Sequence, residues 1–103
     1  MPADNARLLS ATRRVHVVGV GGVGMSAIAS VLAGMGHVVS GSDVKDSPVI
    51  ERLRAKGVTV TIGHGPSAVE GVSLVTYSPA VPESNVEIVE ARRRGIEVVR
   101  RSA

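Results

Sequence analysis

The fold of this chain is decided by one stretch, Val15-His16-Val17-Val18-Gly19-Val20-Gly21-Gly22-Val23-Gly24-Met25-Ser26. A short apolar run passes directly into the pattern G-x-G-x-x-G, formed by Gly19, Gly21 and Gly24, and an apolar helical segment follows. Between a strand and a helix, this pattern is typical of a phosphate site. The first glycine permits a tight turn, the second lets a diphosphate approach the backbone, and the third lets the helix pack close to the strand. The N–H groups that begin the helix would then face an anion.

Outward from this stretch, strand-like and helical segments alternate along the chain. The predicted N-caps are Ser47 for the second helix and either Ser84 or Asn85 for the third. The alternation predicts an α/β fold: a Rossmann-like, three-layer αβα domain with a five-stranded parallel sheet in the order 3-2-1-4-5. The predicted strands are 15–20, 37–43, 58–62, 73–78 and 96–99, the helices are 25–35, 48–56 and 85–94, and 66–70 is a short helical turn.

Composition and length set the limits of this domain. The chain has 103 residues, 44% of them hydrophobic, with no cysteine and a single aromatic residue, Tyr77, so its core is predicted to be aliphatic. No apolar run approaches the roughly 20 residues that span a bilayer, and the N-terminus has no signal-peptide pattern. We therefore expect a cytoplasmic protein with no membrane partner. Residues 1–13 are predicted to be a flexible tail and 14–103 the N-terminal domain of a longer protein, because the chain ends just after its fifth strand.

The net charge of +3 comes largely from arginines late in the chain, at 92–94 and 100–101. The first group ends a predicted helix, where cations complement the helix dipole. No row of aromatic side chains accompanies these arginines to stack on bases. We therefore expect no nucleic-acid partner.

Candidate binding residues follow from the position of the strands. In a parallel α/β sheet, ligands bind at the carboxyl ends of the strands. After the glycine loop, these ends are Ser42-Asp43, Gly63-His64-Gly65 and Ser78-Pro79-Ala80. An acidic residue placed like Asp43 usually accepts hydrogen bonds from a ribose or a base. His16 begins a buried strand and is predicted to be a structural histidine.

Several kinds of chemistry are absent from the sequence. Three histidines without cysteine or close spacing do not make a zinc site, and no serine lies in G-x-S-x-G. The chain also lacks the Gly-Lys-Ser/Thr sequence of an ATP-binding P-loop. We therefore predict no catalytic residue, no metal ligand and no cofactor of its own for this chain.

The wider pattern resembles a known family. The segments that carry the resemblance are 16–26, with its Gly-Gly-x-Gly-Met-Ser loop, 39–43 with Gly-Ser-Asp, 62–64 and 90–96. Together they are similar to the N-terminal domain of the Mur ligases of peptidoglycan synthesis, and specifically to the members that add the first amino acid, L-alanine. The resemblance covers residues 14–101.

This resemblance implies a three-domain, ATP-dependent, amide-forming ligase. Its N-terminal domain binds the UDP part of UDP-N-acetylmuramic acid, and a central P-loop domain binds ATP and Mg²⁺. The muramyl carboxylate is activated as an acyl phosphate, which the amine of L-alanine attacks. A chain that holds only the first domain is expected to be inactive alone.

The resemblance also implies roles for individual residues. Backbone N–H groups of the glycine loop would hold the diphosphate, Ser42 and Asp43 would contact the uridine with His64 nearby, and Ser78 would face the diphosphate or the amino sugar. Position 79 is proline where the family often has serine or threonine, which removes one hydrogen-bond donor. The predicted UDP-sugar-binding residues are Gly19, Gly21, Gly22, Val23, Gly24, Met25, Ser42, Asp43, His64 and Ser78.

Two other functions remain open at this stage. The first is the NAD-binding half of an oxidoreductase, because Asp43 would equally suit the 2′-hydroxyl of NAD. The second is a nucleotide-sensing regulatory module of a transport protein. The doubled glycine and Met25-Ser26 favour the ligase, and a Gly-Lys-Thr sequence further along the parent gene would support it.

Overall fold

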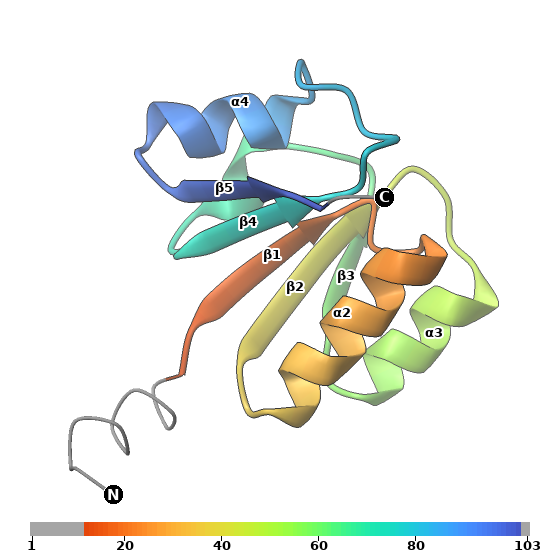
Figure 1. Ribbon diagram of the computed structural model, residues 1–103. Coiled ribbons are helices and arrows are strands. Elements are labelled where there is room, and N and C mark those ends of the chain that lie inside the picture. The colour runs from red at the N-terminus through yellow and green to blue at the C-terminus, as the bar shows by residue number, and fades with distance from the viewer. Residues whose placement is uncertain (1–11, 102–103) are drawn as a thin grey trace, which may run out of the picture.

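Five parallel strands form one sheet in the computed structural model, which describes residues 12–101 (Figure 1). The spatial order is β3-β2-β1-β4-β5, which confirms the predicted topology and places β1 at the centre. The predicted tail over residues 1–13 lies, except for its last two residues, outside the described part of the chain. The strands are β1 (Arg14–Val18), β2 (Val38–Asp43), β3 (Thr59–Ile62), β4 (Leu74–Tyr77) and β5 (Glu97–Arg100).

Helices cover both faces of this sheet, as predicted (Figure 1). On one face lie α2 (Val23–Gly34) and α3 (Pro48–Ala55), and on the other lie α4 (Val86–Arg93) and the 3₁₀ turn η1 (Pro66–Val69). Between residues 12 and 101, none of the helices has the length and apolar character that crossing a bilayer requires.

Side chains cap two of the helices. The Ser47 hydroxyl accepts a hydrogen bond from the N–H of Ile50 at 3.3 Å, and proline follows at the first helical position of α3. The Asn85 side chain accepts from the N–H of Glu87 at 2.9 Å, so Asn85 rather than Ser84 caps α4. These side chains replace the partners that the first N–H groups of a helix lack.

The glycine motif lies partly inside α2, which differs from the prediction. The helix begins at Val23 instead of Met25, so Gly24 lies in its first turn. Strand β1 ends at Val18, and the fully buried Val20 belongs to the loop. The apolar run from Val15 to Val20 therefore continues past the strand because the loop also needs an anchor in the core.

The core has two layers, one on each face of the sheet. The central strand contributes to both, since Val15 and Val17 face α2 and α3 while Val18 faces α4. Such burial on both faces is typical of parallel sheets. The layer under α2 and α3 holds Val15, Val17, Val20, Met25, Ala29, Val39, Ile50, Leu53, Val58 and Val60. The layer under α4 holds Val18, Val69, Val75, Tyr77, Ile88 and Ala91.

The arginines at the end of α4 form ion pairs. Arg92 pairs with Glu83 at 2.5 Å, and both Arg93 and Arg94 pair with Glu90 at 2.6 Å. The hydrogen bonds from Arg93 and Arg94 lower the pKa of Glu90 to about 2. These arginines end α4, as the sequence predicts, and Glu83 and Glu90 offset part of their charge.

The buried Tyr77 provides a test of this part of the fold. Its hydroxyl donates to Glu83, and this hydrogen bond, together with burial, raises the pKa of Tyr77. We expect the phenol of the folded chain to ionise above the ordinary value of about 10. The folded state holds this proton more tightly than the unfolded state does. The contribution of Tyr77 to the free energy of unfolding is therefore complete below the unfolded pKa and is lost as the pH rises through the folded pKa.

An alkaline titration followed by phenolate absorbance measures this shift directly, because Tyr77 is the sole tyrosine and the chain has no tryptophan. The same chain unfolded in urea is the control and should ionise at the ordinary value. Coincident titrations of the folded and unfolded chains would contradict the hydrogen bond between Tyr77 and Glu83.

Candidate functional site

The glycine loop is tied to the carboxyl end of β2 by backbone hydrogen bonds. The N–H groups of Gly19 and Val20 both donate to the carbonyl of Ser42, at 2.8 and 3.1 Å, and Gly22 donates to the carbonyl of Gly19 at 3.2 Å. Gly19 has a φ of 78°, a backbone conformation that residues other than glycine rarely adopt. The predicted tight turn is therefore present at Gly19.

The start of α2 is open to an anion. Gly22 is its N-cap, no side chain in the described part of the chain caps it, and its first turn has no acidic residue. This differs from α3 and α4, which Ser47 and Asn85 cap. The first N–H groups of a helix have no partners within it and carry a partial positive charge. A phosphate group would supply the missing acceptors at this position.

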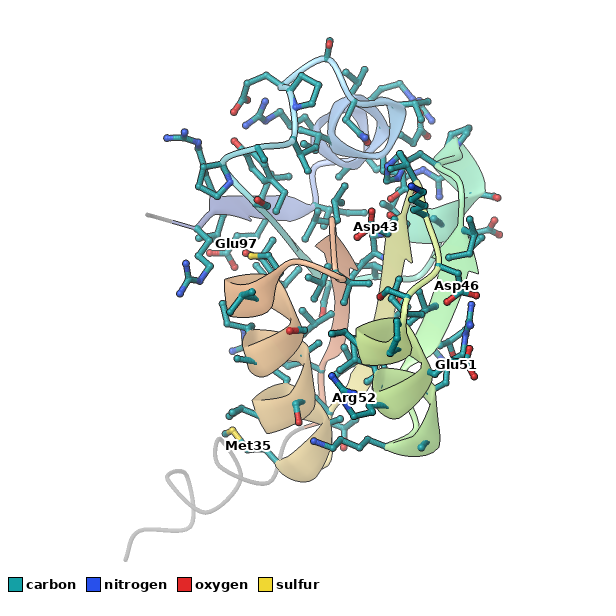
Figure 2. The ribbon with its side chains drawn as sticks, turned by 90° about the vertical axis from the view of Figure 1, so that its right-hand side faces the viewer. Met35, Asp43, Asp46, Glu51, Arg52 and Glu97 are labelled. Carbon is teal, nitrogen blue, oxygen red and sulfur yellow. The ribbon has the colours of Figure 1, made fainter. Side chains whose placement is uncertain are left out.

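The Asp43 carboxylate lies against this loop. One of its oxygens accepts from the N–H of Gly21 at 2.8 Å, and the other accepts from the N–H of Val44 at 2.7 Å. A Cβ atom added at Gly21 would lie 2.8 Å from this carboxylate and 3.3 Å from Ile50. Gly21 therefore makes room for Asp43, and the approach of a diphosphate to its backbone stays a prediction. Figure 2 shows Asp43 near the start of α2, with Met35 at the far end of that helix.

The third glycine of the motif also has a different neighbour from the predicted one. The three atoms nearest to a Cβ added at Gly24 all belong to the guanidinium group of Arg101, at 2.8 to 3.1 Å. The close packing of the helix on its strand that the sequence predicts at Gly24 stays a prediction, since the nearest atoms belong to Arg101. Gly24 allows the cationic side chain of Arg101, just after β5, to lie against the first turn of α2.

A pocket of about 460 Å³ opens beside the loop, within the size range of small-molecule sites. It lies where the carboxyl ends of β1, β2 and β4 meet the loop after β3. Five of the ten predicted residues line it: Gly19, Gly22, Asp43, His64 and Ser78. The other lining residues are Val44, Ala80, Val81, Pro82 and Asn85.

The remaining predicted residues do not line this pocket. The Met25 side chain is buried in the core and Val23 is 92% exposed, so these two could contribute backbone N–H groups rather than side chains. The Ser42 side chain is fully buried and donates a hydrogen bond to Glu87 at 2.6 Å. The structure therefore places the Ser42 hydroxyl behind the pocket and not in its wall.

The segment after β4 contributes more to the pocket than we predicted. The Ser78 hydroxyl accepts from the N–H of Ala80 at 3.1 Å and retains its own hydrogen to donate. The Asn85 oxygen is used in capping α4, which leaves the amide NH₂ as a donor. Val81, Pro82 and Asn85 were missed as site residues, although their position just beyond a strand end could have indicated them.

A buried carboxylate that the sequence does not predict, Glu87, lies behind the pocket. It accepts hydrogen bonds from His16 at 2.7 Å, from Ser42 at 2.6 Å and from the N–H of Gly65 at 3.0 Å. Burial disfavours its charged form, but these three donors outweigh burial and lower the pKa of Glu87. The structural role predicted for His16 is confirmed, since the ring is buried and both nitrogens are bonded. Glu87 lies four residues before the buried Ala91 in the same helix, and this spacing could have indicated that Glu87 is buried too.

The chain is similar to ligases along nearly its whole length. The model of the "Mur ligase family, catalytic domain" matches residues 14–103. UDP-N-acetylmuramate–L-alanine ligase of Rubrobacter xylanophilus is 53% identical over 89 residues, which are 86% of this chain and 20% of that protein. The crystal structure of UDP-N-acetylmuramate–alanine ligase from Thermotoga maritima superposes with a TM-score of 0.82 at 34% identity, over 86% of this chain and 21% of the other.

An NAD-binding protein is also structurally similar, but less closely. The NAD-complexed D-isomer-specific 2-hydroxyacid dehydrogenase from Lactobacillus delbrueckii ssp. bulgaricus has a TM-score of 0.53 at 26% identity, over 70% of this chain and 20% of that one. The described chain spans about a fifth of the length of the ligases that it matches. The match to the family model and the ligase similarity agree with the loop and pocket, and the chain therefore belongs to the Mur ligase family.

Proposed function

We propose that this chain is the domain that binds the UDP part of UDP-N-acetylmuramic acid in an ATP-dependent ligase that adds L-alanine. The observation that carries the proposal is that the uncapped start of α2 and Asp43 lie at the same pocket. The first suits a diphosphate, and the second suits the hydroxyl or N–H donors of a nucleoside. The similarity to L-alanine-adding ligases supports the same assignment.

In this proposal the diphosphate lies at the first turn of α2, where Arg101 adds a positive charge beside Gly24. Asp43 is held by the N–H groups of Gly21 and Val44. Each of its oxygens keeps a lone pair for a donor on the ribose or the uracil. The domain thereby orients the substrate so that the muramyl carboxylate reaches the reacting groups, which contributes to catalysis without bond making.

The residues present do not fit an ATP–Mg²⁺ site. The sequence has no Gly-Lys-Ser/Thr, and the residues from 12 to 101 contain no group of three acidic or histidine side chains placed to hold a metal ion. We therefore assign phosphoryl transfer from ATP, and the attack by L-alanine, to the part of the ligase beyond this chain.

A titration of the ¹⁵N-labelled chain, followed by its amide resonances, tests the proposal. With UDP-N-acetylmuramic acid and with UDP, we expect shifts at the glycine loop, the start of α2 and Asp43. With UMP, the shifts in the loop should be much smaller, because UMP has a single phosphate in place of the diphosphate. With NAD, we expect no saturable shifts.

Shifts that appear only with NAD would contradict the proposal and favour the oxidoreductase function. Shifts that are equal for UDP and UMP would contradict the assignment of the diphosphate to α2. If none of the four compounds shifts any amide resonance, this result would contradict binding by this domain on its own.

A further inference from the structure

Glu87 connects the pocket to the interior of the fold. Its carboxylate is fully buried, and its partners come from β1, β2 and the loop after β3. One oxygen accepts from His16 and Ser42, and the other accepts from the N–H of Gly65 and lies 3.6 Å from Nδ1 of His64. His64 lines the pocket, whereas Glu87 does not.

The hydrogen bonds of Ser42 determine which nitrogen of His64 carries the proton. A serine hydroxyl has one hydrogen, and an ionised Glu87 has none to give, so Ser42 must donate to Glu87 over their 2.6 Å contact. The oxygen of Ser42 is then an acceptor toward Nδ1 of His64, at 3.0 Å. The proton of a neutral His64 must therefore lie on Nδ1, and Nε2 is left unprotonated.

We propose that Glu87 is the positioning residue of this pocket: acting through Ser42 and Gly65, it fixes His64 in the Nδ1–H tautomer, so that Nε2 accepts a hydrogen bond from the nucleoside. This role rests on the proposed UDP binding. The nucleoside groups that fit are donors, namely a ribose hydroxyl or the imide N–H of the uracil. Asp43 and His64 both line this pocket, and in this proposal the Asp43 carboxylate and Nε2 of His64 together select ligands with two donors.

The tautomer is measurable without any ligand. Long-range ¹H–¹⁵N spectra distinguish the two ring nitrogens of a neutral histidine, at about pH 8, where an ordinary histidine is uncharged. In the wild-type chain we expect His64 to carry its proton on Nδ1. A proton on Nε2 would overturn the proposal.

The variant Glu87→Gln tests whether Glu87 controls this state, because an amide offers one acceptor oxygen in place of two. If that oxygen takes the place facing Ser42 and His16, the N–H of Gly65 loses its acceptor and exchanges faster with solvent. If it faces Gly65, the amide NH₂ meets Ser42, the serine hydroxyl reverses, and the His64 proton moves to Nε2. In either case we expect the affinity for UDP to fall by about tenfold.

Glu90→Gln is the matched control, since Glu90 lies one turn later on α4 and pairs with Arg93 and Arg94 away from the pocket. It should leave the His64 tautomer, the Gly65 exchange rate and the UDP affinity unchanged. If Glu87→Gln does not fold, Ser42→Ala is the second variant. It removes both the acceptor for Nδ1 of His64 and the hydroxyl that donates to Glu87, and the His64 ring should then populate both tautomers.

A Glu87→Gln or Ser42→Ala chain with the wild-type tautomer and wild-type UDP affinity would overturn the proposal. A wild-type chain that has the Nδ1–H tautomer and binds no UDP would instead contradict the proposed function. The two failures are therefore distinguishable.

Discussion

Replacing Gly41 by alanine should destabilise the domain by about 1–3 kcal/mol, the usual cost of overpacking a core. An added Cβ atom would lie 2.7 to 2.8 Å from three carbon atoms of Val20. Val20 is fully buried and belongs to the glycine loop, so the clash is relieved only if the loop moves away from β2. We therefore also expect weaker UDP binding. Urea unfolding followed by circular dichroism measures the first effect, and the amide titration measures the second.

Gly34→Ala is the matched control for this substitution. Gly34 ends α2, has no atom within 4 Å of an added Cβ and does not have a positive φ. Alanine there should stabilise the domain by about 0.5–1 kcal/mol, because glycine loses more backbone freedom on folding. Equal stabilities of the two alanine variants would contradict the tight contact between Gly41 and Val20.

Replacing Asp43 by asparagine should lower the affinity for UDP by about 10- to 100-fold. A hydrogen bond to a charged group contributes about 1.5–3 kcal/mol, and a tenfold change in affinity corresponds to about 1.4 kcal/mol. The substitution removes the charge, and it also turns an amide NH₂ toward the N–H of either Gly21 or Val44. The glycine loop, which is proposed to receive the diphosphate, is then less well fixed. Calorimetric titration with UDP gives the affinity.

Asp46→Asn makes the same chemical change three residues later and serves as the control. Asp46 is half exposed and pairs with Arg54 at 3.0 Å, outside the pocket. Loss of an exposed ion pair of this kind has little effect, so the UDP affinity should remain at the wild-type value. A loss of affinity of the same size in both variants would mean that net charge, and not Asp43 itself, governs binding.

The strand and helix pattern was predictable because it depends on local signals. Gly36, Gly57 and Gly95 follow the three helices with positive φ, and Ser47 caps α3 where the sequence indicates it. The sheet order followed from the alternation of elements and from the usual handedness of their connections.

Contacts between distant segments were not predictable in this way. The sequence placed Asp43 near the glycine loop, but it did not show that the carboxylate occupies the N–H of Gly21. Similarly, Arg101 reaches Gly24 and Glu87 reaches His16 across more than 70 residues of sequence, and no local pattern records such pairings. A rule about strand ends identifies candidate residues, whereas the packing decides which side chains face the pocket.

The uncapped start of α2 has a consequence for the lifetime of the protein. If the substrate supplies the missing acceptors, the ligand completes the helix, and folding and binding share the same hydrogen bonds. A ligand that binds only the folded state adds about 2.7 kcal/mol of stability at a hundred times its Kd. If UDP-N-acetylmuramic acid is the ligand, as proposed, its supply would then set how often this domain opens to proteases.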